Sequence, residues 1–161
     1  MATLRFTLEY DGTDFEGWQS QPAGHRTVQD TLETALKRVT GKSVRVIAAG
    51  RTDAGVHAEG QVASAEIENR LSCPELQRAL NTVLPRDLAV VGLEERPTGF
   101  HAQHDARSKL YRYRIWNGSW PSPLRDRRSH WLRAPLDLAA MGEAARGFVG
   151  RHDFASLQTS G

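Results

Sequence analysis

An aspartate between two glycines is the first candidate for chemistry in this sequence. Asp53 lies in the run Gly-Arg-Thr-Asp-Ala-Gly-Val-His over residues 50–57, between two segments that look like strands. The glycines let the backbone turn sharply and present the carboxylate, with Arg51 two residues before it. Aspartate and glycine are also ordinary turn residues. Spacing alone therefore leaves open both a catalytic loop and a simple turn.

Histidines are the next candidates, as ligands for a metal ion. The sequence holds six of them: His25, His57, His101, His104, His130 and His152. His101 and His104 are three residues apart and could share an ion, but neither an HExxH pair nor an HxE motif with a PCxxC motif is present. We therefore expect no metal site, and we interpret the histidines as surface or loop residues. The phosphate-binding P-loop and the dinucleotide-binding fingerprint are also missing from the sequence.

Aromatic and basic residues alternate beyond the middle of the chain. Tyr111 and Tyr113 stand among Lys109, Arg112 and Arg114. Rings next to positive charge suit the stacking of bases together with contact to phosphate. A strand that packs its tyrosines into a core produces the same pattern, and it explains at least one of the two. The pattern alone does not decide between these interpretations.

Positive charge is concentrated in the last part of the chain, although the net charge is only +2. Residues 1–100 carry 11 Lys and Arg against 14 Asp and Glu, whereas residues 101–161 carry 10 against 5. Of the 21 basic residues 18 are arginine, whose planar guanidinium grips phosphate and stacks on bases. Residues 101–161 are therefore a candidate nucleic-acid surface. A genome that prefers arginine codons would explain the composition equally well.

Length and composition are those of a globular protein with one domain, or with one domain and part of a second. The chain has 161 residues, of which 39% are hydrophobic and 25% are charged. No apolar run approaches the roughly 20 residues that cross a membrane, and the N-terminus shows no signal-peptide core. The single cysteine, Cys73, excludes an internal disulfide and a cysteine-based zinc cluster. We expect a cytoplasmic protein that does not enter a membrane.

The first 100 residues alternate between strand-like and helix-like patterns. The patterns predict a strand at 3–10, a helix that starts at Thr27 and stops at Gly41, strands at 44–48 and 62–67, a helix from Ser72 to Val83, and a strand at 87–93. This order is the split βαβ pattern of ferredoxin-like folds. It predicts an antiparallel sheet with both helices on one face.

Residues 101–161 begin a second set of elements. The patterns predict a strand at 109–116, a basic loop at 117–135 and an amphipathic helix from Leu138 that ends at Gly150. In residues 151–161 the hydrophobic residues show no regular spacing. We expect an α+β fold in two parts. Residues 1–100 form a ferredoxin-like half that carries Asp53, and residues 101–161 form the start of a second α/β half.

Several short runs of the sequence form one recognisable set. They lie at residues 9–12, 15–19, 50–58, 80–81, 84–85, 100–102, 111–113 with Asn117, and 152–154. Together they resemble the tRNA pseudouridine synthase A family, over about residues 4–161. The nine residues 50–58 resemble the active-site motif of that family and are highly specific, whereas the dipeptides alone are not.

The resemblance implies that uridine is isomerised to pseudouridine in the tRNA anticodon stem-loop, at tRNA positions 38 to 40. It implies tRNA as the partner, a homodimer, and no cofactor. Asp53 falls on the catalytic aspartate of the family, and Tyr111 falls on the tyrosine that packs against the target base. Arg51 falls on a basic residue suited to hold the tRNA beside the flipped base.

The sequence departs from this family at one point. The family continues into a segment with a Gly-Phe-Leu-Arg-type motif that completes the catalytic domain, and nothing in residues 1–161 matches it. We expect this chain to be a fragment or a truncated product that binds tRNA weakly and does not isomerise uridine by itself.

A non-catalytic RNA-binding module is the alternative function, because the RRM uses a ferredoxin-like sheet. The predicted third strand, with Gln-Val-Ala-Ser-Ala at 61–65, has no counterpart of the RNP1 signature that RRMs carry. A small-molecule-binding or oligomerisation domain is a second alternative. The 18 arginines and the run from Arg51 to His57 argue against it.

Overall fold

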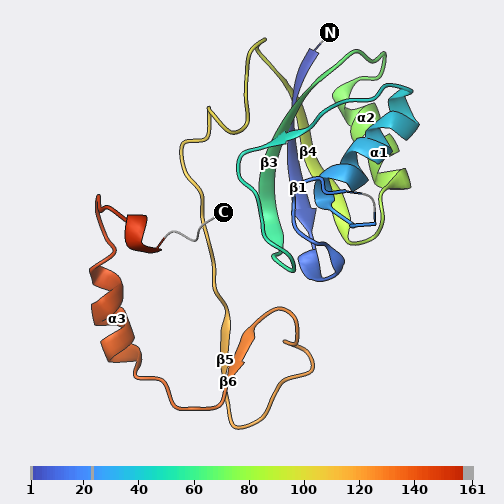
Figure 1. Cartoon of the computed structure of the whole chain (residues 1–161). Helices are drawn as coiled ribbons and strands as arrows, with labels where there is room; N and C mark the ends of the chain where they lie inside the picture. The colour runs from blue at the N-terminus through green and yellow to red at the C-terminus, as the bar shows by residue number, and fades with distance from the viewer. Residues whose placement is uncertain (1, 23, 158–161) are drawn as a thin grey trace. The chain divides into compact units, whose positions relative to one another are not determined.

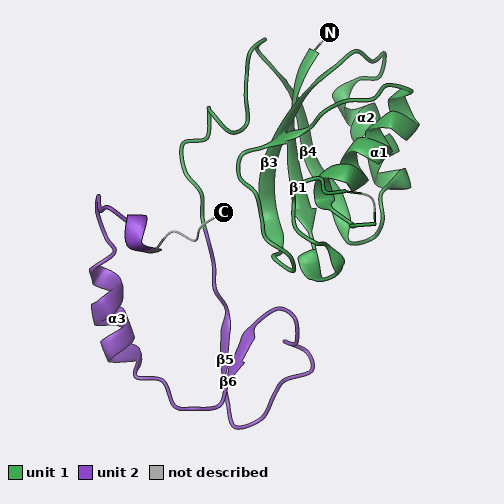
Figure 2. Cartoon of the chain, viewed as in Figure 1, with its two compact units in different colours: residues 1–110 green, residues 111–161 purple. Residues whose placement is uncertain are grey.

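A computed structural model describes residues 2–22 and 24–157 of the chain. These residues fall into two compact units (Figure 2). Unit 1 extends to Leu110, and unit 2 starts at Tyr111.

Unit 1 is a four-stranded antiparallel sheet with two helices. Its elements are β1 (Ala2–Tyr10), the short 3-10 helix η1 (Gly12–Asp14), α1 (Val28–Thr40), β2 (Ile47–Ala48), β3 (Ala58–Ile67), α2 (Cys73–Val83) and β4 (Leu88–Arg96). The strands lie in the order β2-β3-β1-β4, and every neighbouring pair is antiparallel. Both helices lie on one side of the sheet (Figure 1). The structure is therefore a mixed α/β fold with an antiparallel sheet.

The core of unit 1 lies between the sheet and the helices. Leu4, Phe6, Leu8 and Tyr10 alternate along β1, and each is at most 3% exposed. The helices bury Val28, Leu32, Leu36, Leu76 and Leu80 against them. Alternation along a strand and a stripe along a helix thus produce one hydrophobic core, as the sequence pattern predicts.

The ends of α1 and α2 confirm the predicted boundaries. The Thr27 side chain accepts a hydrogen bond from the Asp30 N–H at 3.1 Å, and Gly41 ends α1 with a φ of 73°. The Ser72 N–H donates to the Glu75 carboxylate at 2.9 Å at the start of α2. Local capping chemistry is sufficient to set these ends.

The strand predicted at residues 44–48 is shorter in the structure, since β2 contains only Ile47 and Ala48. The Val46 N–H donates to the Glu33 carboxylate at 2.9 Å, and the Val46 carbonyl accepts from Gln29 Nε2 at 3.1 Å. Gln29 is itself buried. Side chains of α1 therefore satisfy backbone groups that a longer strand would have paired with a neighbour.

Unit 2 contains short elements. They are β5 (Ile115–Asn117), β6 (His130–Leu132), α3 (Leu138–Arg146) and the short 3-10 helix η2 (Ala155–Leu157). The strand predicted at 109–116 is wrong over most of its length, because β5 pairs only with the three-residue β6, in parallel. The helix predicted to reach Gly150 ends at Arg146, with Gly147 as its C-cap. Of the aperiodic tail predicted at 151–161, residues 158–161 lie outside the described part.

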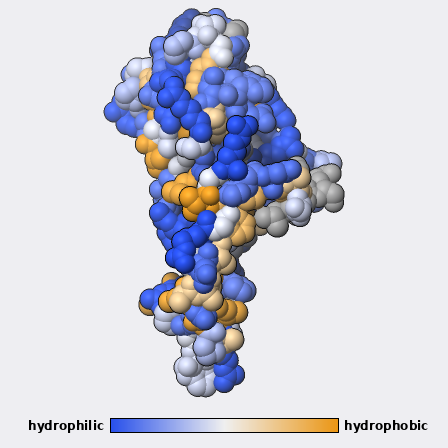
Figure 3. All heavy atoms as spheres, turned by 90° about the vertical axis from the view of Figure 1, so that its left-hand side faces the viewer, coloured by the Kyte–Doolittle hydropathy of each residue, from blue (hydrophilic) through white to orange (hydrophobic). Residues whose placement is uncertain are grey.

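Hydrophobic side chains are frequent on the surface of unit 2. Tyr113 is 90% exposed and Leu124 is 94% exposed, and the described part of α3 buries no residue. Hydrophobic atoms, in orange, are visible on the surface in Figure 3. Among the described helices, none has both the length and the apolar character that crossing a membrane requires.

Candidate active site

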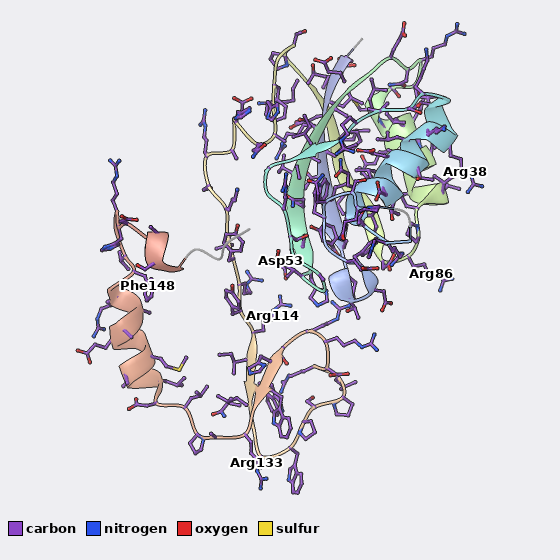
Figure 4. The ribbon with its side chains drawn as sticks, viewed as in Figure 1. Arg38, Asp53, Arg86, Arg114, Arg133 and Phe148 are labelled. Carbon is purple, nitrogen blue, oxygen red and sulfur yellow. The ribbon has the colours of Figure 1, made fainter. Side chains whose placement is uncertain are left out.

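Asp53 lies in the loop at residues 49–57, which connects β2 to β3. Its side chain is exposed, and Figure 4 labels it near β3. The Val56 N–H donates to the Asp53 carbonyl at 3.2 Å, and Gly55 has a φ of 77°, a conformation that favours glycine. The backbone therefore makes the sharp turn at Asp53 that the sequence predicts.

Backbone hydrogen bonds hold the loop on both sides of Asp53. The Thr52 carbonyl accepts from the Trp18 N–H at 2.9 Å, and the Gly55 N–H donates to the Phe15 carbonyl at 3.1 Å. Phe15 and Trp18 are each 2% exposed. The segment that follows β1 therefore anchors the loop in the core, one residue before Asp53 and two residues after it.

A buried tyrosine reinforces this anchor. The Tyr10 hydroxyl and Thr52 Oγ1 are 2.9 Å apart, within hydrogen-bond distance. Burial raises the pKa of Tyr10, which is 3% exposed, so that its hydroxyl stays protonated beyond the usual range. Thr52 is thus held through both its backbone and its side chain.

Two glycines allow the segment after β1 to approach the loop. A Cβ on Gly12 would lie 2.0 Å from the Val56 carbonyl oxygen, and one on Gly17 would lie 2.8 Å from the Thr52 carbonyl oxygen. Gly17 also has a φ of 94°. Any side chain at these two positions would push the loop away.

His57 fastens the end of the loop. Its Nδ1 accepts a hydrogen bond from the Gly12 N–H at 3.1 Å and lies 3.0 Å from a carboxylate oxygen of Asp11. The loop is therefore tied to the segment after β1 at three places, which are Thr52, Gly55 and His57.

An ion pair also stabilises the segment that follows β1. Both terminal nitrogens of Arg26 lie 2.8 Å from the carboxylate oxygens of Asp87, just before β4. The Arg26 guanidinium also lies 4.0 Å from the centre of the Phe15 ring. Because Phe15 accepts the hydrogen bond of Gly55, this pair connects the beginning of β4 to the loop.

The loop and the segments that support it lie within one match to a known family. Residues 7–105 match the sequence model of a family described as tRNA pseudouridine synthase. The chain belongs to the tRNA pseudouridine synthase family.

Curated relatives match nearly the whole chain. The tRNA pseudouridine synthase A of Moorella thermoacetica is 46% identical over 162 residues, covering 100% of this chain and 66% of the relative. The protein of the same name from Pelobacter propionicus is 47% identical, covering 99% and 65%. That from Roseiflexus castenholzii is 47% identical, covering 98% and 58%. The chain thus spans less than two thirds of the length of these relatives.

Within this family member, the three predicted site residues differ in their surroundings. Arg51 and Asp53 are both exposed on the loop, and no residue in 2–22 or 24–157 makes a hydrogen bond or an ion pair with either side chain. Tyr111 is the first residue of unit 2 and is 69% exposed. Of the three predicted site residues, the structure therefore places Arg51 and Asp53 on the same loop.

Sequence reasoning gave no role to Tyr10, Trp18 or His57. The signal was present, because Tyr10 and Trp18 lie in the runs that carry the family resemblance and His57 belongs to the loop motif. Among the described residues, no group of three or more His, Cys, Asp or Glu side chains is arranged to hold a metal ion.

Proposed function

We propose that this chain supplies the catalytic loop of an enzyme that converts uridine to pseudouridine in the tRNA anticodon stem-loop, at positions 38 to 40. Asp53 is the nucleophile. The observation that carries this proposal is an exposed carboxylate on a loop fastened at Thr52, Gly55 and His57. Such a support keeps a reactive group in place before substrate binds. The family and the names of the relatives support tRNA as the substrate.

The reaction exchanges one bond of the uracil for another. The bond between ribose C1′ and N1 breaks, the base rotates, and C1′ forms a bond to C5. The proton on C5 is lost and N1 gains a proton, so that atoms and electrons balance without a cofactor or a metal. A carboxylate can form a covalent intermediate at C1′ or at uracil C6, and both routes are compatible with an exposed Asp53.

Two further side chains act on the substrate in this proposal. The target base must leave the helical stack, which costs a few kcal/mol. The ring of Tyr111 stacks on the flipped base, and Arg51 contacts the RNA next to it. Stacking and charge-assisted contacts offset the cost of flipping.

In this proposal the catalytic domain of the enzyme is built from two halves. The order β1-α1-β2-β3-α2-β4 and the helices on one side of the sheet support a ferredoxin-like split βαβ half at residues 1–100. Residues 101–161 begin a second α/β half. The enzyme acts as a homodimer in the cytoplasm.

Pseudouridine formation in tRNA tests this function. The assay uses the 161-residue chain and a fusion of it to the part of the Moorella thermoacetica relative that lies outside the match. We expect product from the fusion, and none when the fusion carries Asp53→Ala. Binding of tRNA by a fusion that gives no product would instead support the alternative, a non-catalytic RNA-binding module.

A further inference from the structure

A lysine side chain lies across the glycine at the start of the catalytic loop. A Cβ on Gly50 would lie 3.0 Å from Lys109 Nζ, 3.2 Å from Cε and 3.5 Å from Cδ. The end of the Lys109 side chain thus occupies the space that a side chain at position 50 would need. Both residues belong to unit 1, shown in green in Figure 2.

Strand β3 contacts Gly50 and also the segment that leads to Lys109. The Gly50 carbonyl accepts a hydrogen bond from Gln61 Nε2 at 2.6 Å. The segment that leads to Lys109 is attached at Ala102, which is 2% exposed and donates its N–H to Ser64 Oγ at 3.0 Å. Gln61 and Ser64 are residues of β3. The sheet therefore anchors Gly50 directly, and it anchors the segment that precedes Lys109 at Ala102.

Two cations on this surface have no anionic partner in the described chain. Among residues 2–22 and 24–157, no carboxylate makes an ion pair with Lys109 or with Arg51. Both residues are exposed; the end of the Lys109 side chain lies beside Gly50, and Arg51 follows Gly50 in the chain, at the start of the loop that carries Asp53. A point-like ammonium and a planar guanidinium together suit the oxygens of a phosphodiester.

We propose that Lys109 binds a backbone phosphate of the RNA beside the target uridine, and that Gly50 lacks a side chain so that the ammonium can reach this position. The inference rests on the proposed function, because it describes how the same loop holds its substrate. A phosphate contact fixes the register of an RNA without reading its sequence. Lys109 thereby positions the target nucleotide over Asp53.

The affinity for tRNA, measured over a range of salt concentrations, tests the role of the lysine. Lys109→Ala is expected to weaken binding roughly fivefold and to lower the slope of log affinity against log salt by about 1. Lys109→Arg keeps the charge and should retain most of the affinity. Lys37→Ala is the matched control, since Lys37 is an exposed lysine on α1 that should leave binding unchanged.

The variant Gly50→Ala tests the contact between Lys109 and Gly50 by changing the glycine instead of the lysine. The added methyl group displaces the end of the lysine and should weaken binding in the wild-type background. In the Lys109→Ala background it should have no further effect, because the group that it displaces is already gone. Losses that add in the double variant would show that Gly50 serves another purpose.

Besides additive losses in the double variant, two results would overturn the proposal. One is a salt slope that Lys109→Ala leaves unchanged. The other is a fall in kcat at unchanged tRNA affinity, together with a shifted pH profile of the reaction. That result would show that Lys109 acts on the Asp53 carboxylate and not on a phosphate of the RNA. Failure of the proposed function gives a different result. The fusion would then form no pseudouridine, while Lys109→Ala still lowered the salt slope.

Discussion

Asp53 owes its place to residues that contact its neighbours in the chain. Tyr10 and Trp18 hold Thr52, Phe15 holds Gly55, and Gly12 holds His57. The carboxylate itself stays exposed. The group proposed to react is thus separate from the groups that position it, so that substitutions in the two sets should have different effects.

Tyr111 is proposed to act by stacking, which two substitutions test. Tyr111→Phe keeps the ring and removes the hydroxyl, whereas Tyr111→Leu removes both. Stacking of a base on an aromatic ring contributes about 1–3 kcal/mol, so the Phe variant should retain much more pseudouridine formation than the Leu variant. Equal loss in single-turnover assays of both variants would assign the role to the hydroxyl.

The raised pKa of Tyr10 predicts how stability depends on pH. Burial raises this pKa above its ordinary value of 10.0, so above that pH the unfolded chain loses the proton before the folded chain does. The free energy of unfolding should therefore be intact below about pH 10 and decrease as the pH rises towards the pKa of the folded state.

Tyr10→Phe isolates this contribution. At neutral pH the variant should be less stable by about 1 kcal/mol, because it loses the hydrogen bond to Thr52. Its disadvantage should shrink above pH 10, as measured by urea unfolding. Tyr113→Phe serves as the control, since Tyr113 is 90% exposed and should leave stability unchanged at every pH. A constant difference between Tyr10→Phe and the wild type across this range would contradict the assignment.

Among the elements, the close approach of η1 to the loop at residues 49–57 makes Gly12 critical. Gly12→Ala places a methyl group 2.0 Å from the Val56 carbonyl oxygen, so backbone must move. We expect a loss of about 1–3 kcal/mol in the free energy of unfolding and a marked fall in pseudouridine formation. Gly60→Ala is the matched control on β3, where no heavy atom lies within 4 Å of the added group. Similar behaviour of the two variants would show that the approach is not critical.

Elements with local signals are predictable from this sequence. The alternation of β1 and the caps at Thr27, Gly41 and Ser72 act within a few residues, and the structure has these elements where the pattern places them. The turn at Asp53 is local in the same way. Each depends on neighbours in the chain, which a sequence pattern records directly.

Elements with distant partners are not predictable in this way. The length of β2 depends on Gln29 and Glu33. These side chains of α1 form hydrogen bonds with the backbone N–H and carbonyl of Val46. The hydrogen bonds that anchor the loop at Thr52, Gly55 and His57 join residues about 40 positions apart in the sequence, as in the contact of Tyr10 with Thr52. A linear pattern records neither, because it does not state which side chains meet in space.

Over the whole chain, the distribution of charge predicts which residues contact tRNA in the proposed function. Residues 105–133 are rich in arginine, and the Arg125 guanidinium lies 4.0 Å from the centre of the Trp116 ring. We expect this region to contact phosphates. Each phosphate contact contributes roughly 0.7–0.9 to the slope of log affinity against log salt.

Joint replacement of Arg125, Arg127 and Arg128 by glutamine tests that expectation. The salt slope for tRNA should become flatter, and affinity should fall by a similar factor for tRNAs of different sequence. Replacement of Arg38, Arg78 and Arg86 in unit 1 controls for the loss of three charges. A slope that the first set leaves unchanged would show that these arginines do not face the RNA.

The replacement Asp53→Asn tests the proposed reaction most directly, because it preserves the shape of the side chain and removes its charge. Single-turnover pseudouridine formation and tRNA affinity should both be measured with the fusion used above. We predict no detectable product, with tRNA affinity close to that of the wild type. The reason is that the hydrogen bonds that anchor the loop at Thr52, Gly55 and His57 do not involve the Asp53 carboxylate. Appreciable turnover by Asp53→Asn would contradict the assignment of Asp53 as the nucleophile.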